Sequence, residues 1–147
     1  MSAIKSTYKG SCHCGAIGYL FTTEIPPHEW VVRACQCSFC RAHGGCSTAD
    51  PNGSVRFTIS DPSRLNRYRF ALKITDFFVC NACGVYVGAV MPLPERSLAV
   101  VNLRTLVSPV EFPPASPASY EGESASERQA RREQWWTPVE GAEPLDR

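Results

Sequence analysis

The fold is decided by two matching stretches of sequence, CHCG at residues 12–15 and CNACG at residues 80–84. Each stretch has two cysteines followed by glycine, which permits a positive φ and lets the backbone fold closely around an ion. Two such knuckles supply four thiolates, enough to close a tetrahedral structural zinc site. The predicted ligands are Cys12, Cys14, Cys80 and Cys83. Because the halves lie far apart in sequence, the ion would join the first strand to a late hairpin and strengthen the fold.

The chain has eight cysteines among 147 residues, and their even number makes disulfide bonding the first alternative. We expect free thiols instead, because residues 1–10 show no apolar signal region and a reducing compartment keeps thiols free. The cysteines also come in groups with gaps of one or two residues, and such close neighbours rarely meet disulfide geometry. The spacing therefore favours metal binding.

A third group lies in the stretch CQCSFC at residues 35–40. Cys35, Cys37 and Cys40 are close enough in sequence to surround one ion, but Arg41 rather than glycine follows them. Three protein ligands with one position left for water or substrate is the pattern of a catalytic zinc. This group is therefore predicted to be a second site, different in kind from the first.

Two residues after this group compete for the fourth ligand position. Cys46 lies six residues after Cys40, and the glycine pair in the intervening RAHGG lets the chain turn back toward the ion. If Cys46 binds the ion, both zinc sites are structural. Cys46 is alternatively a small buried thiol or a redox partner. His43 is the second candidate ligand. Alternatively, His43 is a polar loop residue or a proton shuttle beside the zinc.

Short apolar runs separated by turn residues fill the chain from Lys5 to about Phe112. In one of them Val55, Phe57 and Ile59 alternate with polar residues, the period of a half-buried strand. Similar runs predict strands at residues 16–23, 30–34, 54–59, 65–72, 77–80, 85–91 and 97–103. No ten-residue helical stripe interrupts these runs, so the predicted fold class is mainly β, with antiparallel sheets.

The composition changes after Phe112, first to prolines and then to polar residues. This change predicts a zinc-binding β domain at residues 1–112 and a proline-rich linker with a C-terminal tail at residues 113–147. Ser124 and Glu127 have the spacing of a capping box, which predicts a helix over residues 124–135.

The alternative for this tail is disorder, given its polar composition. Trp135 and Trp136 argue against complete disorder, because two adjacent indoles are costly to leave in water. We therefore expect the tail to dock on the core or on a partner subunit, which would make the protein a homodimer.

The overall charge and hydropathy exclude several classes of partner. The formal net charge is +1, from 15 basic and 14 acidic side chains, so no global field attracts nucleic acid or an anionic membrane. No apolar run is long enough to span a bilayer. We expect a soluble cytoplasmic protein whose partners are small molecules.

The three cysteine motifs, taken together and in order, resemble a known family. GSCHCGAIGY at residues 10–19, CQCSFCR at 35–41 and FFVCNACGVYVG at 77–88 are similar to the glutathione-dependent formaldehyde-activating enzymes, a family that includes centromere protein V. The resemblance covers roughly the first three quarters of the chain, and Ala42 departs from the second basic residue that members often carry. It implies an Mss4-like β-tent held by zinc, with glutathione and formaldehyde as substrates. It also implies a structural zinc on Cys12, Cys14, Cys80 and Cys83 and an active-site zinc on Cys35, Cys37 and Cys40.

A zinc held by three thiolates can activate a substrate thiol or polarise a carbonyl. The leading hypothesis is a carbon–sulfur lyase that forms or cleaves thiol–aldehyde adducts, like an S-hydroxymethylglutathione synthase. Arg41 would bind a substrate carboxylate, since guanidinium pairs with carboxylates through two hydrogen bonds, and His43 would lie beside it. The alternative for Arg41 is packing on the surface. The alternative function is a non-catalytic zinc-stapled binding or scaffold module in which both sites are structural.

Overall fold

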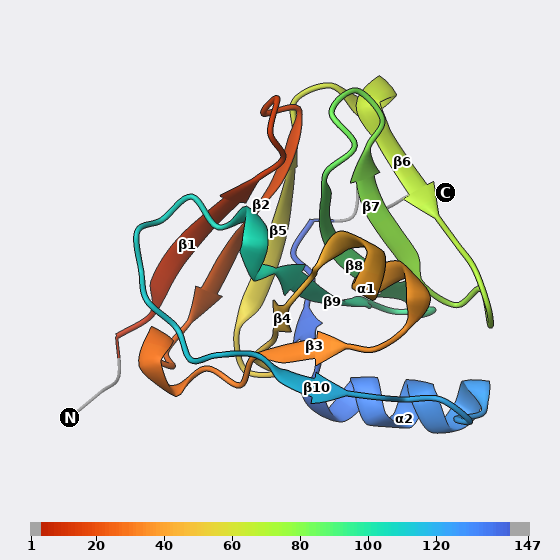
Figure 1. Cartoon of the computed structure of the whole chain (residues 1–147). Helices are drawn as coiled ribbons and strands as arrows, with labels where there is room; N and C mark the ends of the chain where they lie inside the picture. The colour runs from red at the N-terminus through yellow and green to blue at the C-terminus, as the bar shows by residue number, and fades with distance from the viewer. Residues whose placement is uncertain (1–3, 142–147) are drawn as a thin grey trace.

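The computed structural model describes residues 4–141, which form two β-sheets that lean together like a tent (Figure 1). The smaller sheet has the strand order β1-β2-β5 and is antiparallel throughout. Its strands are β1 (Ser6–Ser11), β2 (Ile17–Thr23) and β5 (Ser54–Ile59). In Figure 1 the turn between β1 and β2 lies at the top of the tent, near the turn that follows β7.

The larger sheet has the order β10-β3-β4-β9-β8-β7-β6, with β11 pairing on β9. Its neighbouring strands are antiparallel except for the parallel pair β10–β3. In chain order the strands are β3 (Arg33–Cys35), β4 (Ser47–Thr48), β6 (Leu65–Tyr68), β7 (Asp76–Cys80), β8 (Tyr86–Pro92), β9 (Ser97–Asn102), β10 (Ser116–Ala118) and β11 (Thr137–Pro138). The predicted fold class, mainly β with antiparallel sheets, is confirmed.

Two α-helices flank the larger sheet. Helix α1 (Ser38–His43) lies inside the cysteine stretch, and α2 (Ala125–Trp135) runs beneath β3 and β10 at the base of the tent (Figure 1). Single 3-10 turns are η1 (Pro27–Glu29), η2 (Pro62–Arg64) and η3 (Leu103–Thr105). Within residues 4–141, every helix is too short or too polar to cross a lipid bilayer.

The core lies between the two sheets, where the alternation seen in the sequence places large side chains inward. Val55 and Phe57 of β5 are buried, and Phe57 packs on Phe78 of β7 with ring centroids 4.7 Å apart. Tyr19 is fully buried and donates a hydrogen bond to the carbonyl of Asn102 (3.1 Å), which links the sheets directly. A Cβ at Gly10 would lie 2.1 Å from the Tyr19 ring, so the neighbouring strand needs glycine there.

Most predicted strands form, but two predicted runs are shortened at one end. The run predicted at 65–72 ends at Tyr68, because the chain then turns through Ala71 and Lys73, which both adopt positive φ. The run predicted at 30–34 becomes strand only from Arg33, since the chain first leaves the turn of η1. Strands β1, β4, β10 and β11 and helix α1 were not predicted.

The predicted C-terminal helix is confirmed as α2, with its capping box. Ser124 accepts a hydrogen bond from the Glu127 backbone N–H (3.2 Å), and the Glu127 carboxylate accepts one from the Ser124 N–H (3.0 Å). The helix is held on the core at both ends, by β10 pairing on β3 and by β11 pairing on β9. Trp136 is buried, whereas Trp135 remains 47% exposed.

Candidate metal centre and adjoining cavities

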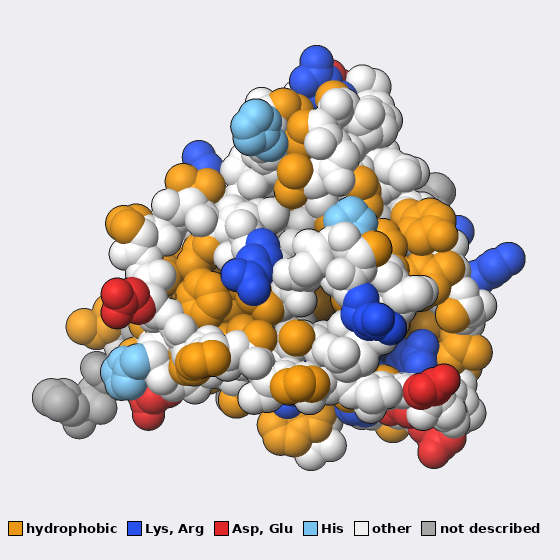
Figure 2. All heavy atoms as spheres, in the orientation of Figure 1, with side chains coloured by type: hydrophobic (Ala, Val, Ile, Leu, Met, Phe, Trp, Pro, Cys, Tyr) orange, Lys and Arg blue, Asp and Glu red, His pale blue; other side chains and the backbone are white. Residues whose placement is uncertain are grey.

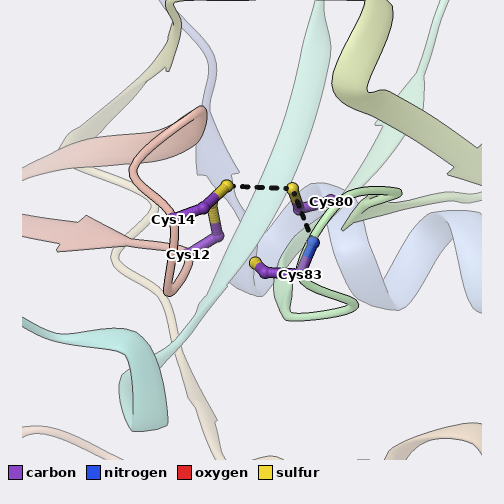
Figure 3. Close-up of side chains that lie close together, drawn as sticks. All are labelled: Cys12, Cys14, Cys80 and Cys83. Atoms are coloured by element: carbon purple, nitrogen blue, oxygen red, sulfur yellow. Dashed lines mark hydrogen bonds between the residues drawn. The ribbon is translucent and has the colours of Figure 1, made fainter.

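Four cysteines meet where the two sheets converge (Figure 3). Cys12 and Cys14 come from the turn between β1 and β2, and Cys80 and Cys83 from the turn between β7 and β8. The sulfur of Cys14 lies 3.7 Å from that of Cys12 and 3.5 Å from that of Cys80. These separations are far longer than a disulfide bond, and all four thiols are free. They are close to the roughly 3.8 Å between sulfurs of a tetrahedral zinc site with bonds of about 2.3 Å.

The backbone of each knuckle has the conformation predicted from its glycine. Gly15 and Gly84 have φ values of 86° and 79°, a region that other residues adopt only with strain. The turns also direct backbone N–H groups at sulfur: Ile17 N donates to Cys12 Sγ (3.4 Å) and Cys83 N to Cys80 Sγ (3.5 Å). Such donors favour the thiolate form that a metal ion requires.

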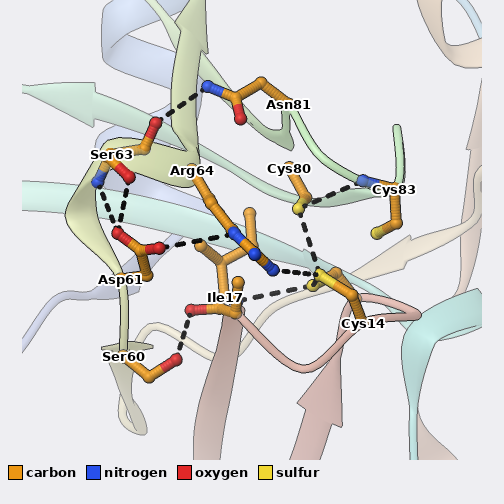
Figure 4. Close-up of polar contacts among 11 residues, drawn as sticks. Cys14, Ile17, Ser60, Asp61, Ser63, Arg64, Cys80, Asn81 and Cys83 are labelled. Carbon is orange, nitrogen blue, oxygen red and sulfur yellow. Dashed lines mark hydrogen bonds and ion pairs between the residues drawn. The ribbon is translucent and has the colours of Figure 1, made fainter.

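A charged side chain faces the four-cysteine group from η2 (Figure 4). Arg64 donates from Nη1 to Cys14 Sγ at 3.7 Å, and its Nε pairs with Asp61 at 3.3 Å. Asn81, inside the second knuckle, donates to the Ser63 carbonyl (2.9 Å) and so fixes the knuckle to the same turn. Four thiolates around a divalent ion carry a net negative charge, which Arg64 partly offsets.

The thiol of Cys14 has a pKa below its usual value. The largest cause is a hydrogen bond from the backbone of Ala16, followed by one from the thiol of Cys80. Four convergent sulfurs, N–H donors and a nearby guanidinium together fit a thiolate-bound metal such as zinc.

The second group, Cys35, Cys37 and Cys40, lies at the junction of β3 and α1. Its three sulfurs lie within 4.8 Å of one another. Cys35 ends β3, and Cys37 is the N-cap of α1, where its sulfur accepts from the Cys40 backbone N–H at 3.4 Å. Cys37 and Cys40 are three residues apart, so a single helical turn places both on one face toward Cys35.

The acidities of these thiols differ because they share hydrogen bonds. The pKa of Cys35 falls to about 5, chiefly because the Cys40 thiol donates to it. Burial opposes this shift, while the backbone of Cys37 and the charge of Arg132 add to it. The pKa of Cys40 is raised in turn, first by its bond to Cys35 and then by burial. A stabilised thiolate among three convergent sulfurs is the donor chemistry of a zinc site.

Neither of the two candidates for the fourth ligand position belongs to the group of three close sulfurs. Cys46 is buried in the core and lies outside the group of mutually close sulfurs. Its backbone N–H is held by the Asn102 side chain (3.4 Å), and burial raises the pKa of its thiol. His43 is exposed and also lies outside the group; its ring packs on Phe39 at 4.5 Å between centroids.

A small inner cavity of about 70 Å³ opens beside the three-cysteine group. Its wall includes Cys35, Cys40, Cys46, Tyr86, Arg132 and Trp136. Tyr86 is buried, and its pKa is raised well above normal, first by burial and then by the charges of the three cysteines. Its phenol therefore stays protonated near neutral pH and can donate a hydrogen bond into this cavity.

A larger outer cavity of about 460 Å³ lies on the other side of Cys35. Its basic wall residues are Arg41, Lys73, Arg128, Arg131 and Arg132. On the surface, Lys and Arg side chains gather between α1 and the start of α2, beside a few acidic ones (Figure 2). Of the two residues predicted to bind substrate, Arg41 lines the outer cavity and His43 lines neither cavity.

The sequence reasoning missed Tyr86 and Arg132 as site residues. Tyr86 stands in an apolar strand, VYVGAVM, where nothing in the pattern separates it from ordinary core residues. Arg132 stands in the polar helix, where a charge normally faces water, yet it is only 7% exposed. The adjacent Trp135 and Trp136 were the available signal, because they indicated that this part of the helix docks on the core.

The cysteine motifs also agree with what is known of other proteins. The sequence model of the family described as glutathione-dependent formaldehyde-activating enzyme matches residues 7–121. A comparison with curated proteins gave no match. The chain is similar to a crystal structure of a Rhodobacter sphaeroides protein, at 24% identity and a TM-score of 0.49, over 70% of this chain and 90% of that one. Because the family model matches well over half of its length, the chain belongs to the glutathione-dependent formaldehyde-activating enzyme family.

Proposed function

We propose that the protein is a zinc-dependent carbon–sulfur lyase that forms or cleaves thiol–aldehyde adducts. Cys12, Cys14, Cys80 and Cys83 would hold a structural zinc, and Cys35, Cys37 and Cys40 the zinc of the active site. The observation that carries this proposal is the contrast between the two groups. The first has four convergent sulfurs, while the second has three and borders two cavities.

In the forming direction, a thiol adds across the carbonyl of an aldehyde to give an S-(1-hydroxyalkyl) adduct. One carbon–sulfur bond forms, the thiol proton leaves sulfur, and one proton reaches the carbonyl oxygen, so no oxidant or reductant is needed. Bound zinc lowers the pKa of a thiol and polarises a carbonyl, the two activations that this addition uses. Cleavage is the same step in reverse.

The chain's own residues would bind the substrate and move the proton. The phenol of Tyr86 would donate to the carbonyl oxygen as the carbon–sulfur bond forms, since it stays protonated beside the cysteines. Arg41 would attract an anionic substrate from the rim of the outer cavity. The buried Trp136 would keep bulk water from the inner cavity.

Two further parts of the proposal concern the whole chain. Residues 1–112 would form the metal-binding unit and residues 113–147 an appended segment that completes the cavity wall through α2. The eight cysteines are free thiols, which supports a reducing, cytoplasmic location.

The metal arrangement is tested by X-ray absorption and metal analysis of the purified chain. We expect two zinc ions per chain, one bound by four sulfurs and the other by three sulfurs and one exchangeable lighter atom. Four sulfurs at both sites would contradict the open site and would favour the scaffold function instead.

The reaction is tested by NMR exchange between hydrated formaldehyde and the adduct of glutathione. We expect faster exchange with the zinc-loaded protein than in buffer, and no acceleration by a Cys37→Ala variant that keeps the four-cysteine site. The same assay with other thiols and aldehydes separates the general reaction from the specific use of glutathione. Failure with every pair tried would contradict the enzymatic proposal.

A further inference from the structure

One buried cation in the cavity wall has a donor group without a hydrogen-bond partner among the described residues. Arg132 of α2 is only 7% exposed, and its Nε has no hydrogen-bond partner within residues 4–141. Its Nη1 donates to the hydroxyl of Thr75, and its guanidinium carbon lies 4.2 Å from the ring centroid of Trp136. Neither neighbour carries a negative charge. The Cys35 thiolate is near enough for its charge to act on Arg132, but it does not accept a hydrogen bond from Nε.

The neighbouring arginines of the same helix share one carboxylate. Arg128 pairs with Glu123 at 3.2 Å, and Arg131 pairs with the same carboxylate at 2.8 Å while it stacks on Tyr120 at 3.5 Å. Glu123 thus forms ion pairs with two partly buried arginines and none with the buried Arg132. Burial, followed by the charges of Arg131 and Arg128, lowers the pKa of Arg132, yet a guanidinium remains protonated at neutral pH.

A buried guanidinium whose Nε lacks an acceptor destabilises the empty protein. Transfer of a charge out of water is expensive unless a counter-charge and hydrogen bonds replace the water. Groups in such unfavourable electrostatic surroundings cluster at functional sites, where a ligand can supply the missing partner. The missing partner here is an anion with acceptor atoms that match the planar fork of arginine, which a carboxylate provides.

The position of Arg132 indicates which part of the substrate would carry that anion. Arg132 lines both the inner and the outer cavity, and Cys35 of the three-cysteine group lines both as well. An anion on Arg132 therefore lies next to Cys35, whereas the exposed Arg41 lines only the outer cavity of the two. The inner cavity, at about 70 Å³, has room for a small group and not for a peptide.

We propose that Arg132 binds the carboxylate of a compact thiol substrate, in which one or two carbons separate that carboxylate from the reacting sulfur. This proposal rests on the proposed function, because it places the sulfur at the three-cysteine group. Arg132 lies outside residues 7–121, which match the family model, so membership of the family does not assign its role. It is a specificity residue supplied by the C-terminal helix.

The test measures thiol binding to the zinc-loaded full chain by calorimetry, with two ligands that differ in one group. Mercaptoacetate has the carboxylate, and 2-mercaptoethanol has a neutral hydroxyl at the same distance from sulfur. We expect mercaptoacetate to bind at least about tenfold more tightly, the usual effect of a charge-assisted hydrogen bond. The preference should persist at about 0.5 M salt, because the contact is buried.

Variants assign the preference to one side chain. Arg132→Gln should lose the preference for mercaptoacetate while still binding 2-mercaptoethanol, and Arg132→Lys should restore part of it. The control is Arg56→Gln, which removes the same charge from an exposed side chain of β5 that lines neither cavity. It should change the preference by less than about threefold. Thermal unfolding without ligand should show Arg132→Gln to be as stable as the parent or more so, because a buried donor without an acceptor is gone.

Each failure has a distinct meaning. Equal binding of the two thiols by the parent protein, a preference that disappears in salt, or a preference unchanged in Arg132→Gln would overturn the role of Arg132 and leave the proposed function standing. Absence of binding by either thiol would overturn both proposals. If Arg132→Gln does not fold, the parent protein's preference in high salt and the Arg132→Lys variant still decide the question.

Discussion

At the scale of single residues, Tyr86 is the group whose removal tests the chemistry most directly. Tyr86 lines the inner cavity, and Tyr86→Phe keeps the buried ring and removes only the hydroxyl. We expect turnover of the thiol–aldehyde adduct to fall about a hundredfold or more, the usual contribution of a positioned acid or base. Steady-state kinetics on the zinc-loaded variant measures this loss.

The control for this substitution is another tyrosine of the larger sheet. Tyr68 is 45% exposed, stacks on Phe39 and lines neither cavity. Tyr68→Phe should leave turnover within about twofold of the parent. Equal losses in both variants would point to a general effect on packing and not to a role for the Tyr86 hydroxyl.

Metal content distinguishes the cysteines of the two groups from Cys46. Cys35→Ala removes one of three sulfurs, so we expect it to retain only the zinc of the four-cysteine group. Cys46→Ala removes a thiol that lies outside both groups and should keep zinc at both sites. Metal analysis after gel filtration measures both variants, and loss of one zinc from Cys46→Ala would make it the fourth ligand.

The sequence predicted the cysteines of both groups well, because metal ligands leave a pattern of type and spacing that survives without a structure. Tyr86 and Arg132 leave no such pattern. Their proposed roles depend on which strand or helix packs beside them. The sequence around a tyrosine in an apolar strand, or around an arginine in a polar helix, does not show whether that residue lines a cavity.

At the scale of elements, the knuckle turns impose a conformation that can be tested. Gly84 has φ 79°, and a side chain there would meet no neighbour within 4 Å, so the strain of Gly84→Ala comes from the backbone alone. We expect a loss of about 1–2 kcal/mol in the free energy of unfolding. Denaturant unfolding of the zinc-loaded variant measures this loss.

Gly45→Ala is the matched control, because Gly45 does not have positive φ and a Cβ added there would meet the Tyr86 ring at an ordinary 3.6 Å. Its free energy of unfolding should stay within about 0.5 kcal/mol of the parent value. A control as destabilised as Gly84→Ala would remove positive φ as the explanation.

Apart from β1, the strands and the helix that the sequence did not predict are short. Helix α1 has six residues and a cysteine as its N-cap, so it has neither a helical stripe nor a usual polar N-cap. Strands β10 and β11 have three and two residues and each contains a proline, which argues against a strand in isolation. These two strands pair with β3 and β9, and such a distant partner is not visible in local sequence.

At the scale of the whole molecule, the four-cysteine group ties the smaller sheet to the larger one. A chelator should therefore remove zinc in two phases. The three-cysteine site, which borders the cavities, should release its ion first with little change in circular dichroism. The four-cysteine site should release its ion later, together with unfolding, since metal binding there is part of folding.

A colorimetric zinc assay run in parallel with circular dichroism follows both phases. Cys35→Ala provides the control, because it should show only the slow phase. Release of both ions in one step, with the fold retained, would contradict a structural role for the four-cysteine group.

The tent itself was implied by the resemblance of the motifs to a known family. The knuckles alone predicted only that an ion joins the first strand to a late hairpin. The closure of its base was not foreseen. Strand β10 pairs parallel with β3, and α2 lies beneath this pair. This arrangement brings residues from the chain's last quarter close to Cys35.

The separation of the two knuckles also matters while the chain is being made. Cys14 and Cys80 are 66 positions apart, which at a ribosomal rate of about 5–20 residues per second is a delay of roughly 3 to 13 seconds. During that interval Cys12 and Cys14 have no second pair with which to share an ion. The nascent chain therefore passes through a period in which oxidants or the wrong metal can reach the first pair, and this period ends when the second pair is synthesised.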